Sequence, residues 1–179
     1  MELWDVLTDS GVPTGKKIKR GGYVLKSGEY HLVVHIWPVS KDGAFLIQRR
    51  SFKKKLMPGE WAATGGAAMA GEDSFTAAKR ELKEELGLEP EIKFIKRIKR
   101  RNSFIDIWGA EVKCTVDSLK LQKSEVACAK WVSAQNLEKM VKKGEFHNYG
   151  RDYFNIIFNF AKSIKLKKKD QQNKKEVKV

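Results

Sequence analysis

Three acidic residues, Glu81, Glu84 and Glu85, lie within five positions of one another in a chain whose net charge is +14. On a helix, residues at i, i+3 and i+4 share one side, so these three carboxylates would face one another. Like charges at such spacings cost roughly 0.2–0.5 kcal/mol per pair, and the helix dipole disfavours anions near its C-terminal end. The arrangement therefore indicates a cation beside the acids, either basic side chains of the same helix or a bound divalent metal ion.

The segment around these acids has clear helix boundaries. Asp73 or Ser74 can cap the N-terminus. Gly87 suits the left-handed position after the last turn, and Pro90 prevents the helix from continuing. The apolar residues expected to form its buried stripe are Phe75, Ala78, Leu82 and Leu86. The sequence thus predicts a helix that packs one stripe on the core and presents the acids on another side.

The spacing of this segment also matches a longer pattern, G-x5-E-x7-R-E-U-x-E-E-x-G-U, in which U is an aliphatic residue. The matching residues are Gly66, Glu72, Arg80, Glu81, Leu82, Glu84, Glu85, Gly87 and Leu88. This pattern is the signature of the Nudix hydrolases, and the chain resembles that superfamily. The resemblance implies an α/β fold, an α/β/α sandwich with a central mixed β-sheet and a loop, helix and loop formed by the motif.

In Nudix enzymes the motif holds one or more Mg2+ or Mn2+ ions against a diphosphate, and carboxylate oxygens suit these hard cations. The metal ligands that the resemblance implies are Glu81, Glu84 and Glu85. Arg80 is the expected ion-pair partner that orients Glu72 or a neighbouring Glu. Gly66 and Gly87 would provide the tight backbone at the two ends of the motif.

The reaction that the resemblance implies is attack of water on one phosphorus of an X–O–P–O–P group, as in a nucleoside diphosphate linked to another moiety. Divalent ions serve such a reaction by lowering the pKa of water and neutralising phosphate charge. The candidates for a general base are Glu81 and Glu125, since Nudix enzymes often recruit a further Glu from a loop after the motif. For Glu125, a solvated loop acid is an equal alternative.

Residues 28–61 resemble one branch of the superfamily, the isopentenyl-diphosphate isomerases, in which a basic loop before a P-G-x-W turn clamps the diphosphate. By that match Arg50 and Lys54 would contact the phosphates. His31 would stand where the isomerases place a metal-binding His, although a core or rim histidine is an equal alternative in an apolar strand.

Departures from the isomerase pattern argue against isomerase activity. Gly66 occupies the position of the isomerase Cys, and Ala68 that of a metal-ligand His. Phe104 and Asp106 replace an acidic pair. The predicted function is therefore a Mg2+- or Mn2+-dependent hydrolase of a small-molecule diphosphate. The alternatives are an isomerase-like enzyme and a non-catalytic nucleotide- or RNA-binding module.

Strand-like runs lie on both sides of the acidic helix, at 31–37, 44–50, 92–98, 103–114 and 127–133. Asp42-Gly43 predicts a hairpin between the first two. Ser133 can cap a helix that ends at Gly144, and a last helical pattern follows. Strands combined with flanking helices favour a layered α/β domain. The predicted organisation is an N-terminal arm or edge hairpin (1–30), a catalytic domain (31–163) and a Lys-rich flexible tail (164–179).

Much of the positive charge is local. Eight lysines fall in the last 18 residues, and six basic residues fall in 93–101. The former are expected to form a solvated tail. The latter are expected to form a strand with one solvated face or a rim that attracts phosphate. Nucleic acid is a less favoured partner, because metabolite diphosphates need positive potential too, and any chain this basic binds RNA with an affinity that falls steeply as salt rises.

Other features exclude several classes of protein. Cys114 and Cys128 lack C-x-x-C spacing, so neither a zinc site nor a disulfide framework is indicated. No apolar run reaches the ~18 residues needed to cross a bilayer, and the N-terminus lacks the order of a signal peptide. We therefore expect a cytoplasmic protein without a membrane partner. Homodimerisation is common in the superfamily and stays open.

Overall fold

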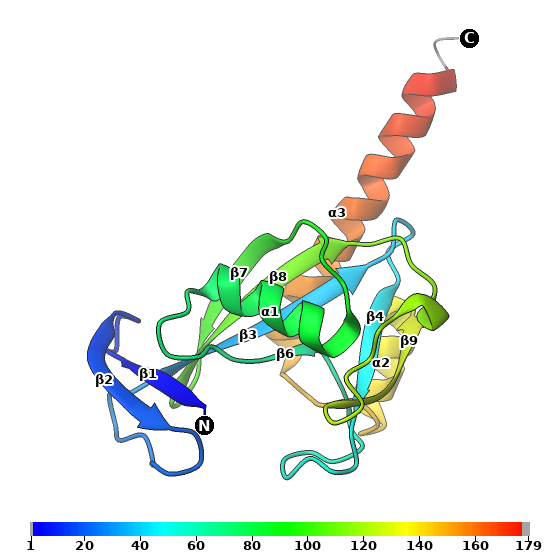
Figure 1. Ribbon diagram of the computed structural model, residues 1–179. Helices are drawn as coiled ribbons and strands as arrows, with labels where there is room; N and C mark the ends of the chain where they lie inside the picture. The colour runs from blue at the N-terminus through cyan, green and yellow to red at the C-terminus, as the bar shows by residue number, and fades with distance from the viewer. Residues whose placement is uncertain (1, 177–179) are drawn as a thin grey trace.

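The computed structural model describes the backbone of residues 2–176 and the side chains of residues 2–166. Its elements follow the chain in an order that begins with strands and ends with helices (Figure 1). They are β1 (Leu3–Leu7), β2 (Pro13–Lys19), β3 (His31–Val39), β4 (Phe45–Arg50), β5 (Trp61–Ala62), β6 (Thr64–Ala67), α1 (Ser74–Leu86), β7 (Lys93–Lys99), β8 (Ser103–Glu111), a 3-10 turn (Val116–Ser118), β9 (Val126–Val132), α2 (Ala134–Lys142) and α3 (Arg151–Glu176).

Seven of these strands form one mixed sheet, whose central order is β5-β4-β3-β8-β7. β6 pairs with β3, and β9 pairs with β4. β3 and β8 run parallel along their whole length, whereas the other ladders of this sheet are antiparallel. The predicted hairpin is present at its turn, where Val39 pairs with Phe45. Beyond the turn the two strands diverge, because β3 pairs with β6 and β8 while β4 pairs with β5 and β9.

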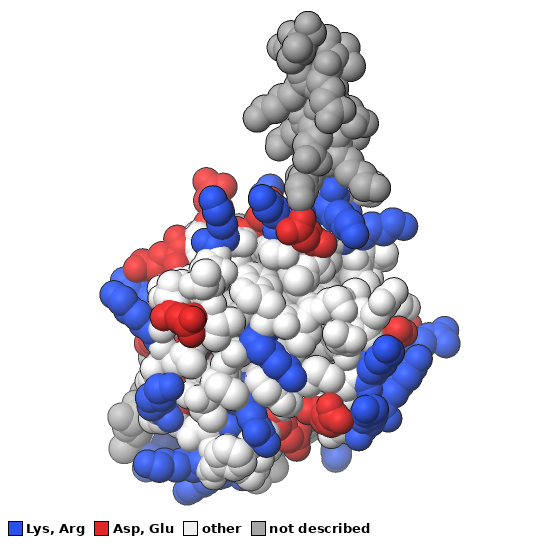
Figure 2. Space-filling model, turned by 90° about the vertical axis from the view of Figure 1, so that its right-hand side faces the viewer, with Lys and Arg blue, Asp and Glu red and all other residues white. Residues whose placement is uncertain are grey.

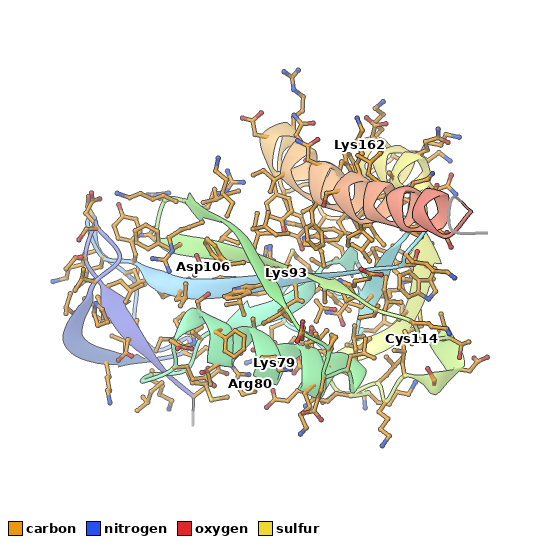
Figure 3. The ribbon with its side chains drawn as sticks, turned by 90° about the horizontal axis from the view of Figure 1, so that it is seen from above. Lys79, Arg80, Lys93, Asp106, Cys114 and Lys162 are labelled. Carbon is orange, nitrogen blue, oxygen red and sulfur yellow. The ribbon has the colours of Figure 1, made fainter. Side chains whose placement is uncertain are left out.

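The sheet lies between two helical layers, with α1 on one face and α2 and α3 on the other (Figure 3). Side chains alternate along a strand, so each buried strand serves both layers. In β3, Val34 and Ile36 join the core under α1, while Trp37 and Val39 join the core under α2 and α3. Trp37 also donates a 2.8 Å hydrogen bond to the Tyr153 hydroxyl of α3. The predicted α/β/α sandwich with a central mixed sheet is confirmed.

The helix α1 begins and ends where the sequence predicts. The Asp73 side chain accepts a 2.7 Å hydrogen bond from the Thr76 N–H, and Gly87 is left-handed with φ 69°. Three of the four predicted core residues are fully buried, but Phe75 is 49% exposed. The prediction is wrong for Phe75, because its ring packs edge-on against Trp108, with centroids 5.7 Å apart, instead of entering the core.

The N-terminal arm contains a separate two-stranded sheet, formed by β1 and β2. Leu7 and Tyr30 exchange backbone hydrogen bonds of 2.7 and 3.0 Å, which attach this hairpin to the start of β3. The Ala70 N–H donates a 2.8 Å bond to the Leu3 carbonyl. The hairpin therefore also packs on the loop that leads into α1 (Figure 1).

The last helix is longer than the sequence predicts. Because α3 runs to Glu176, the predicted boundary before residue 164 falls inside a helix, and Ile164 is buried. The predicted Lys-rich tail (164–179) thus begins as a continuation of α3, and its residues 177–179 lie outside the described residues. In the part of the chain that the structure describes, no helix is both long and apolar enough to cross a membrane.

The basic cluster of residues 93–101 lies mainly on β7, an edge strand of the sheet. Arg97 makes two hydrogen bonds, of 2.6 and 2.8 Å, to the buried carboxylate of Asp106 in β8. Lys99 pairs with Asp9 of the arm. On the face shown in Figure 2, Lys and Arg are interspersed with Asp and Glu rather than gathered in one continuous patch. Part of the basic cluster therefore serves structural ion pairs.

Candidate active site

A small cavity of about 170 Å³ lies beside α1 and collects residues from four separate parts of the chain. Its walls come from the N-terminal arm, from β4 with the basic loop after it, from β6 with α1, and from the loop before β9. The lining residues are Glu2, Arg20, Arg50, Lys54, Gly65, Gly66, Met69, Arg80, Glu81, Glu84, Glu85, Gln122 and Glu125. A larger cavity of about 380 Å³ between β8 and α3 contains none of the motif residues.

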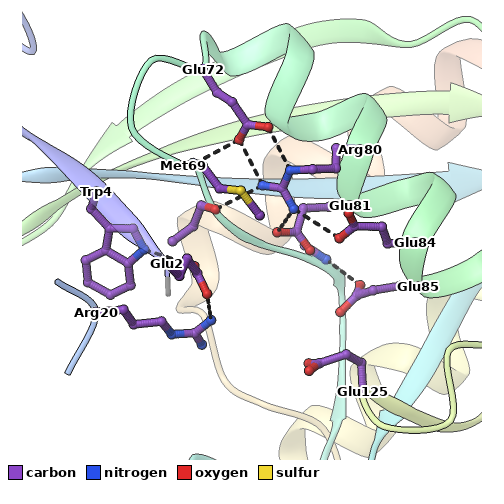
Figure 4. Close-up of polar contacts among 12 residues, drawn as sticks. Glu2, Trp4, Arg20, Met69, Glu72, Arg80, Glu81, Glu84, Glu85 and Glu125 are labelled. Carbon is purple, nitrogen blue, oxygen red and sulfur yellow. Dashed lines mark hydrogen bonds and ion pairs between the residues drawn. The ribbon is translucent and has the colours of Figure 1, made fainter.

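Arg80 is the centre of the polar contacts beside this cavity (Figure 4). Its Nε and Nη2 donate to the two carboxylate oxygens of Glu72 at 2.7 and 2.9 Å. Its Nη1 donates to Glu81 at 2.8 Å and to Glu84 at 3.1 Å, and Nη2 also reaches the Ala67 carbonyl at 3.2 Å. The bond to Arg80 lowers the pKa of Glu72. Arg80 therefore ties the motif loop to two acids of the helix.

Glu85 is the most buried acid of the site, with 4% of the residue exposed. Burial raises the pKa of Glu85 to about 8, and the charge of Glu81 acts in the same direction. Oε2 accepts a 2.8 Å bond from the Gln48 amide and a 2.9 Å bond from the Gly65 N–H. Among the described residues its hydrogen-bond partners are thus neutral. A positive charge placed at this carboxylate would favour its ionised form.

Glu81 lies against the backbone of β6. Burial raises its pKa, although the adjacent Arg80 guanidinium opposes that shift. A Cβ atom added to Gly66 would lie 2.4 Å from Oε1 of Glu81, closer than any real contact allows. Because Gly66 has no side chain, the Glu81 carboxylate can occupy this position.

The basic loop after β4 supplies two cations to the opposite wall. Nε and Nη2 of Arg50 donate to the Leu56 carbonyl at 3.2 and 3.1 Å, which fixes the guanidinium. Lys54 pairs with the Glu125 carboxylate. A backbone bond of 2.8 Å from the Ser51 N–H to the Glu125 carbonyl joins this loop to the loop before β9. The structure thus brings the predicted residues Arg50, Lys54 and Glu125 to the acids of α1.

His31 is not brought into this set. Its ring stacks on Trp4 with centroids 4.4 Å apart and an interplanar angle of 12°. Burial, with a smaller contribution from the charge of Arg20, lowers the pKa of His31 to about 4. His31 is absent from the lining of the cavity, so we leave it out of the candidate site.

The donor set fits a hard divalent cation. Five carboxylates and four cationic side chains line the cavity, so a diphosphate bound there needs further positive charge. Carboxylate oxygens are the ligands that Mg2+ and Mn2+ prefer. As the side chains stand, no three His, Cys, Asp or Glu groups in the described part of the chain converge on one point. Instead, the acids of α1 accept hydrogen bonds from Arg80, Gln48 and Gly65.

Several residues that line the cavity or contact its acids are absent from the sequence predictions. Gln48 contributes the amide that contacts Glu85, and its place in the strand run 44–50 carries no signal for that role. Gln122 comes from the loop before β9. Glu2 and Arg20 come from the arm, to which the sequence assigns no function. Long-range packing, not local spacing, brings these four side chains to the cavity or to the acids that line it.

Comparison with known proteins places this site in a family. The family model for the NUDIX domain matches residues 29–151. The chain belongs to the Nudix family. An uncharacterized Nudix hydrolase of Listeria monocytogenes is 37% identical over 172 residues, covering 93% of this chain and 99% of its own length. This chain is thus similar, over nearly all of its length, to a protein named as a Nudix hydrolase.

Two further similarities concern a shorter stretch and the fold. The nucleoside triphosphatase NudI of Enterobacter is 36% identical to this Nudix chain over 58 residues, or 32% of this chain and 41% of NudI. The crystal structure of DR0079 from Deinococcus radiodurans superimposes with a TM-score of 0.74 at 21% identity, over 87% of this chain and 97% of that one. The second match establishes that the two proteins share a fold.

Proposed function

We propose that this Nudix hydrolase is a divalent-metal-dependent pyrophosphohydrolase. Its substrate would be a nucleoside diphosphate linked to another moiety, or a related diphosphate metabolite. The observation that carries the proposal is the shared cavity, in which the three acids of α1 face Arg50, Lys54 and Glu125. Such a set provides carboxylates for Mg2+ or Mn2+ and cations for phosphate oxygens within one small volume.

The size and lining of the cavity indicate what part of a substrate it holds. Pockets for drug-sized ligands usually measure about 300–1,000 Å³, whereas this cavity measures about 170 Å³. Among the residues that the structure describes, Met69 is the one apolar side chain in its lining. The cavity therefore suits the charged diphosphate, and the organic moieties would extend beyond it.

Each lining residue then has a distinct task. Arg50 and Lys54 bind phosphate oxygens, and Arg50 is already oriented by the Leu56 carbonyl. Glu81, Glu84 and Glu85 would hold the divalent cation, which neutralises phosphate charge and lowers the pKa of water when bound.

The second group of tasks concerns position and proton transfer. Arg80 orients Glu81 and Glu84, and the amide of Gln48 orients Glu85. Glu81 and Glu125 are the candidates to accept the proton of the attacking water. Glu125 is oriented for this by its ion pair with Lys54.

The contacts of two other residues weigh against isomerase chemistry. Asp106, which stands where the isomerases have a Glu, is 1% exposed and committed to Arg97. The space beside Gly66 that a Cys side chain would need is occupied by the Glu81 carboxylate. A non-catalytic binding module is disfavoured because all the acids of the motif face the cavity or Arg80.

The test is hydrolysis of a panel of diphosphate compounds with Mg2+ or Mn2+, followed as release of phosphate or nucleotide. The panel includes nucleoside diphosphate sugars, ADP-ribose and nucleoside triphosphates, the last because of the similarity to NudI. Wild type is compared with Glu84→Gln, in which one carboxylate becomes an amide. Glu89→Gln is the matched control, since Glu89 is exposed and pairs with Lys83 outside the cavity.

We expect Glu84→Gln to lower kcat/KM by at least about 100-fold and Glu89→Gln to change it by less than about 2-fold. Removal of divalent ions with a chelator should abolish turnover, and added Mg2+ should restore it. Glu84 is 45% exposed in its side chain, so the variant should fold normally. Equal activity in wild type and Glu84→Gln would refute the proposed role of the acids.

A further inference from the structure

The cavity has a wall that comes from outside the segment matched by the family model, which begins at residue 29. Glu2 and Arg20 of the N-terminal arm line it together with the acids of α1. The two residues are neighbours because the arm folds back as a hairpin, with the Arg20 N–H donating a 3.1 Å bond to the Glu2 carbonyl. Folding of the arm thus delivers a cation and an acid to the site.

The Arg20 side chain is held in place by two neighbours (Figure 4). Its Nη1 donates a 2.7 Å bond to Oε2 of Glu2, and its guanidinium lies 5.8 Å from the centre of the Trp4 ring. Trp4 Nε1 donates a 3.0 Å bond to the other oxygen of Glu2. Trp4 is itself stacked on His31, the first residue of β3. A chain of contacts therefore connects Arg20 to the central sheet.

Most of the hydrogen-bonding capacity of Arg20 is still available. A guanidinium has five N–H donors. Among the residues that the structure describes, Glu2 is the one side chain to which Arg20 donates. The Arg20 side chain is 46% exposed. A planar fork of free donors, fixed at the wall of a cavity, is suited to two oxygens of a phosphate group.

The other cations that line the cavity belong to later segments of the chain. Arg50 and Lys54 belong to β4 and the loop after it, and Lys54 is already paired with Glu125. Arg80 is occupied by Glu72, Glu81 and Glu84. Of the four cations, Arg20 thus combines a fixed position with a large number of free donors.

We propose that Arg20 is a substrate-binding residue, which contacts the phosphate oxygens of the bound diphosphate from the side of the N-terminal hairpin. Glu2 and Trp4 are positioning residues that hold its guanidinium. This proposal rests on the proposed function, because it takes the cavity to be the diphosphate site. It makes the hairpin a component of the active site and not only an attachment to the domain.

The experiment compares wild type, Arg20→Ala, Arg20→Lys and Lys17→Ala. Lys17 is the control, because it lies on β2, which ends immediately before Arg20, is exposed and does not line the cavity. KM and kcat are measured on a substrate from the panel, and inorganic pyrophosphate is used as a competitive inhibitor with Mg2+. The affinity for pyrophosphate is also measured by calorimetry, which does not depend on turnover.

For Arg20→Ala we expect KM and the pyrophosphate dissociation constant to rise about 10-fold or more, because a charge-assisted hydrogen bond is lost. The value of kcat should change by less than about 2-fold, since the contact is made equally by bound substrate and transition state. Arg20→Lys should fall between wild type and Arg20→Ala. Lys17→Ala should match wild type.

Two failures are distinguishable. If wild type hydrolyses a substrate but Arg20→Ala behaves like Lys17→Ala in KM and pyrophosphate affinity, the role of Arg20 is refuted and the hydrolase stands. If wild type hydrolyses nothing, the proposed function fails. Calorimetry still decides whether Arg20 binds phosphate, and unchanged affinity in Arg20→Ala overturns that claim. Melting temperatures and the Arg20→Lys result identify any variant whose hairpin has been disturbed.

Discussion

The substitution Gly66→Ala provides a sharp test of how the site is built. The added Cβ would lie 2.4 Å from Oε1 and 2.7 Å from Cδ of Glu81. Ordinary contact begins near 3.4 Å, so the Glu81 carboxylate must retreat by about 1 Å. That movement also strains its 2.8 Å bond to Arg80. The perturbation therefore acts on the position of one proposed metal ligand.

The expected effect on activity is large and the effect on folding small. A misplacement of about 1 Å at a reacting centre can cost about 100-fold in rate, so kcat/KM should fall by roughly that factor. The atoms that must move belong to the end of a flexible side chain. Replacing Gly by Ala at a compatible backbone position stabilises by about 0.4–1 kcal/mol, which offsets part of the weakened ion pair. The net change in unfolding free energy should stay within about 1 kcal/mol.

Gly65→Ala is the matched control, because a Cβ atom added at this neighbouring glycine would meet backbone atoms instead of a side chain. Gly65 has φ 148°, and its added Cβ would lie 2.0 Å from the carbonyl oxygen of Val34 in β3. That clash cannot be relieved by a rotamer change, so Gly65→Ala should lose more than about 3 kcal/mol of stability. The assay is kcat/KM together with thermal melting. Wild-type kcat/KM in Gly66→Ala, or melting as low as that of Gly65→Ala, would refute the reasoning.

Two further predictions concern charge. His35 is partly buried beside Tyr153, and loss of hydration there lowers its pKa to about 3. Between pH 6.5 and 3, the unfolded chain therefore binds a proton at His35 that the folded chain does not. The stability that neutral His35 contributes is therefore fully present above pH 6.5, and the free energy of unfolding should fall by about 2 kcal/mol at pH 5. Melting curves of His35→Gln should show a smaller loss of stability between these two pH values. Parallel pH dependence in both proteins would contradict this. Arg80→Lys removes the bidentate contact with Glu72. In a denaturant titration it should lower the free energy of unfolding by about 2 kcal/mol, and kcat/KM should fall at least about 10-fold. An unchanged unfolding midpoint would argue against the role of Arg80.

The helix and its acids are predictable from sequence because their determinants are local. Asp73 and Gly87 fix its ends, and spacing alone places Glu81, Glu84 and Glu85 on one side. The fold class is also predictable, because strand runs on both sides of the helix leave few layered arrangements. Phe75 shows the limit, since period alone assigns it to the core whereas its ring packs edge-on against Trp108 and stays 49% exposed.

The rest of the site depends on contacts between distant segments. The sequence does not distinguish Glu85 from Glu84, yet the former is buried against Gln48 and the latter is half exposed. No local signal shows that β4 passes beneath the end of α1. Similarly, the pairing of Arg20 with Glu2 follows from the register of the hairpin and from the docking of Trp4 on His31. These features follow from tertiary packing, which spacing does not encode.

The separateness of the two-stranded sheet has a consequence for the temperature range in which the enzyme works. An isolated hairpin is only marginally stable, so β1 and β2 depend on their attachments to Tyr30, His31 and the loop before α1. Such a unit opens at a lower free energy than the central sheet. Because it carries Arg20 and one wall of the cavity, heating should raise KM before the core melts. The hairpin would then set the temperature limit for tight substrate binding, and strengthening its attachments would extend that limit without any change to the core.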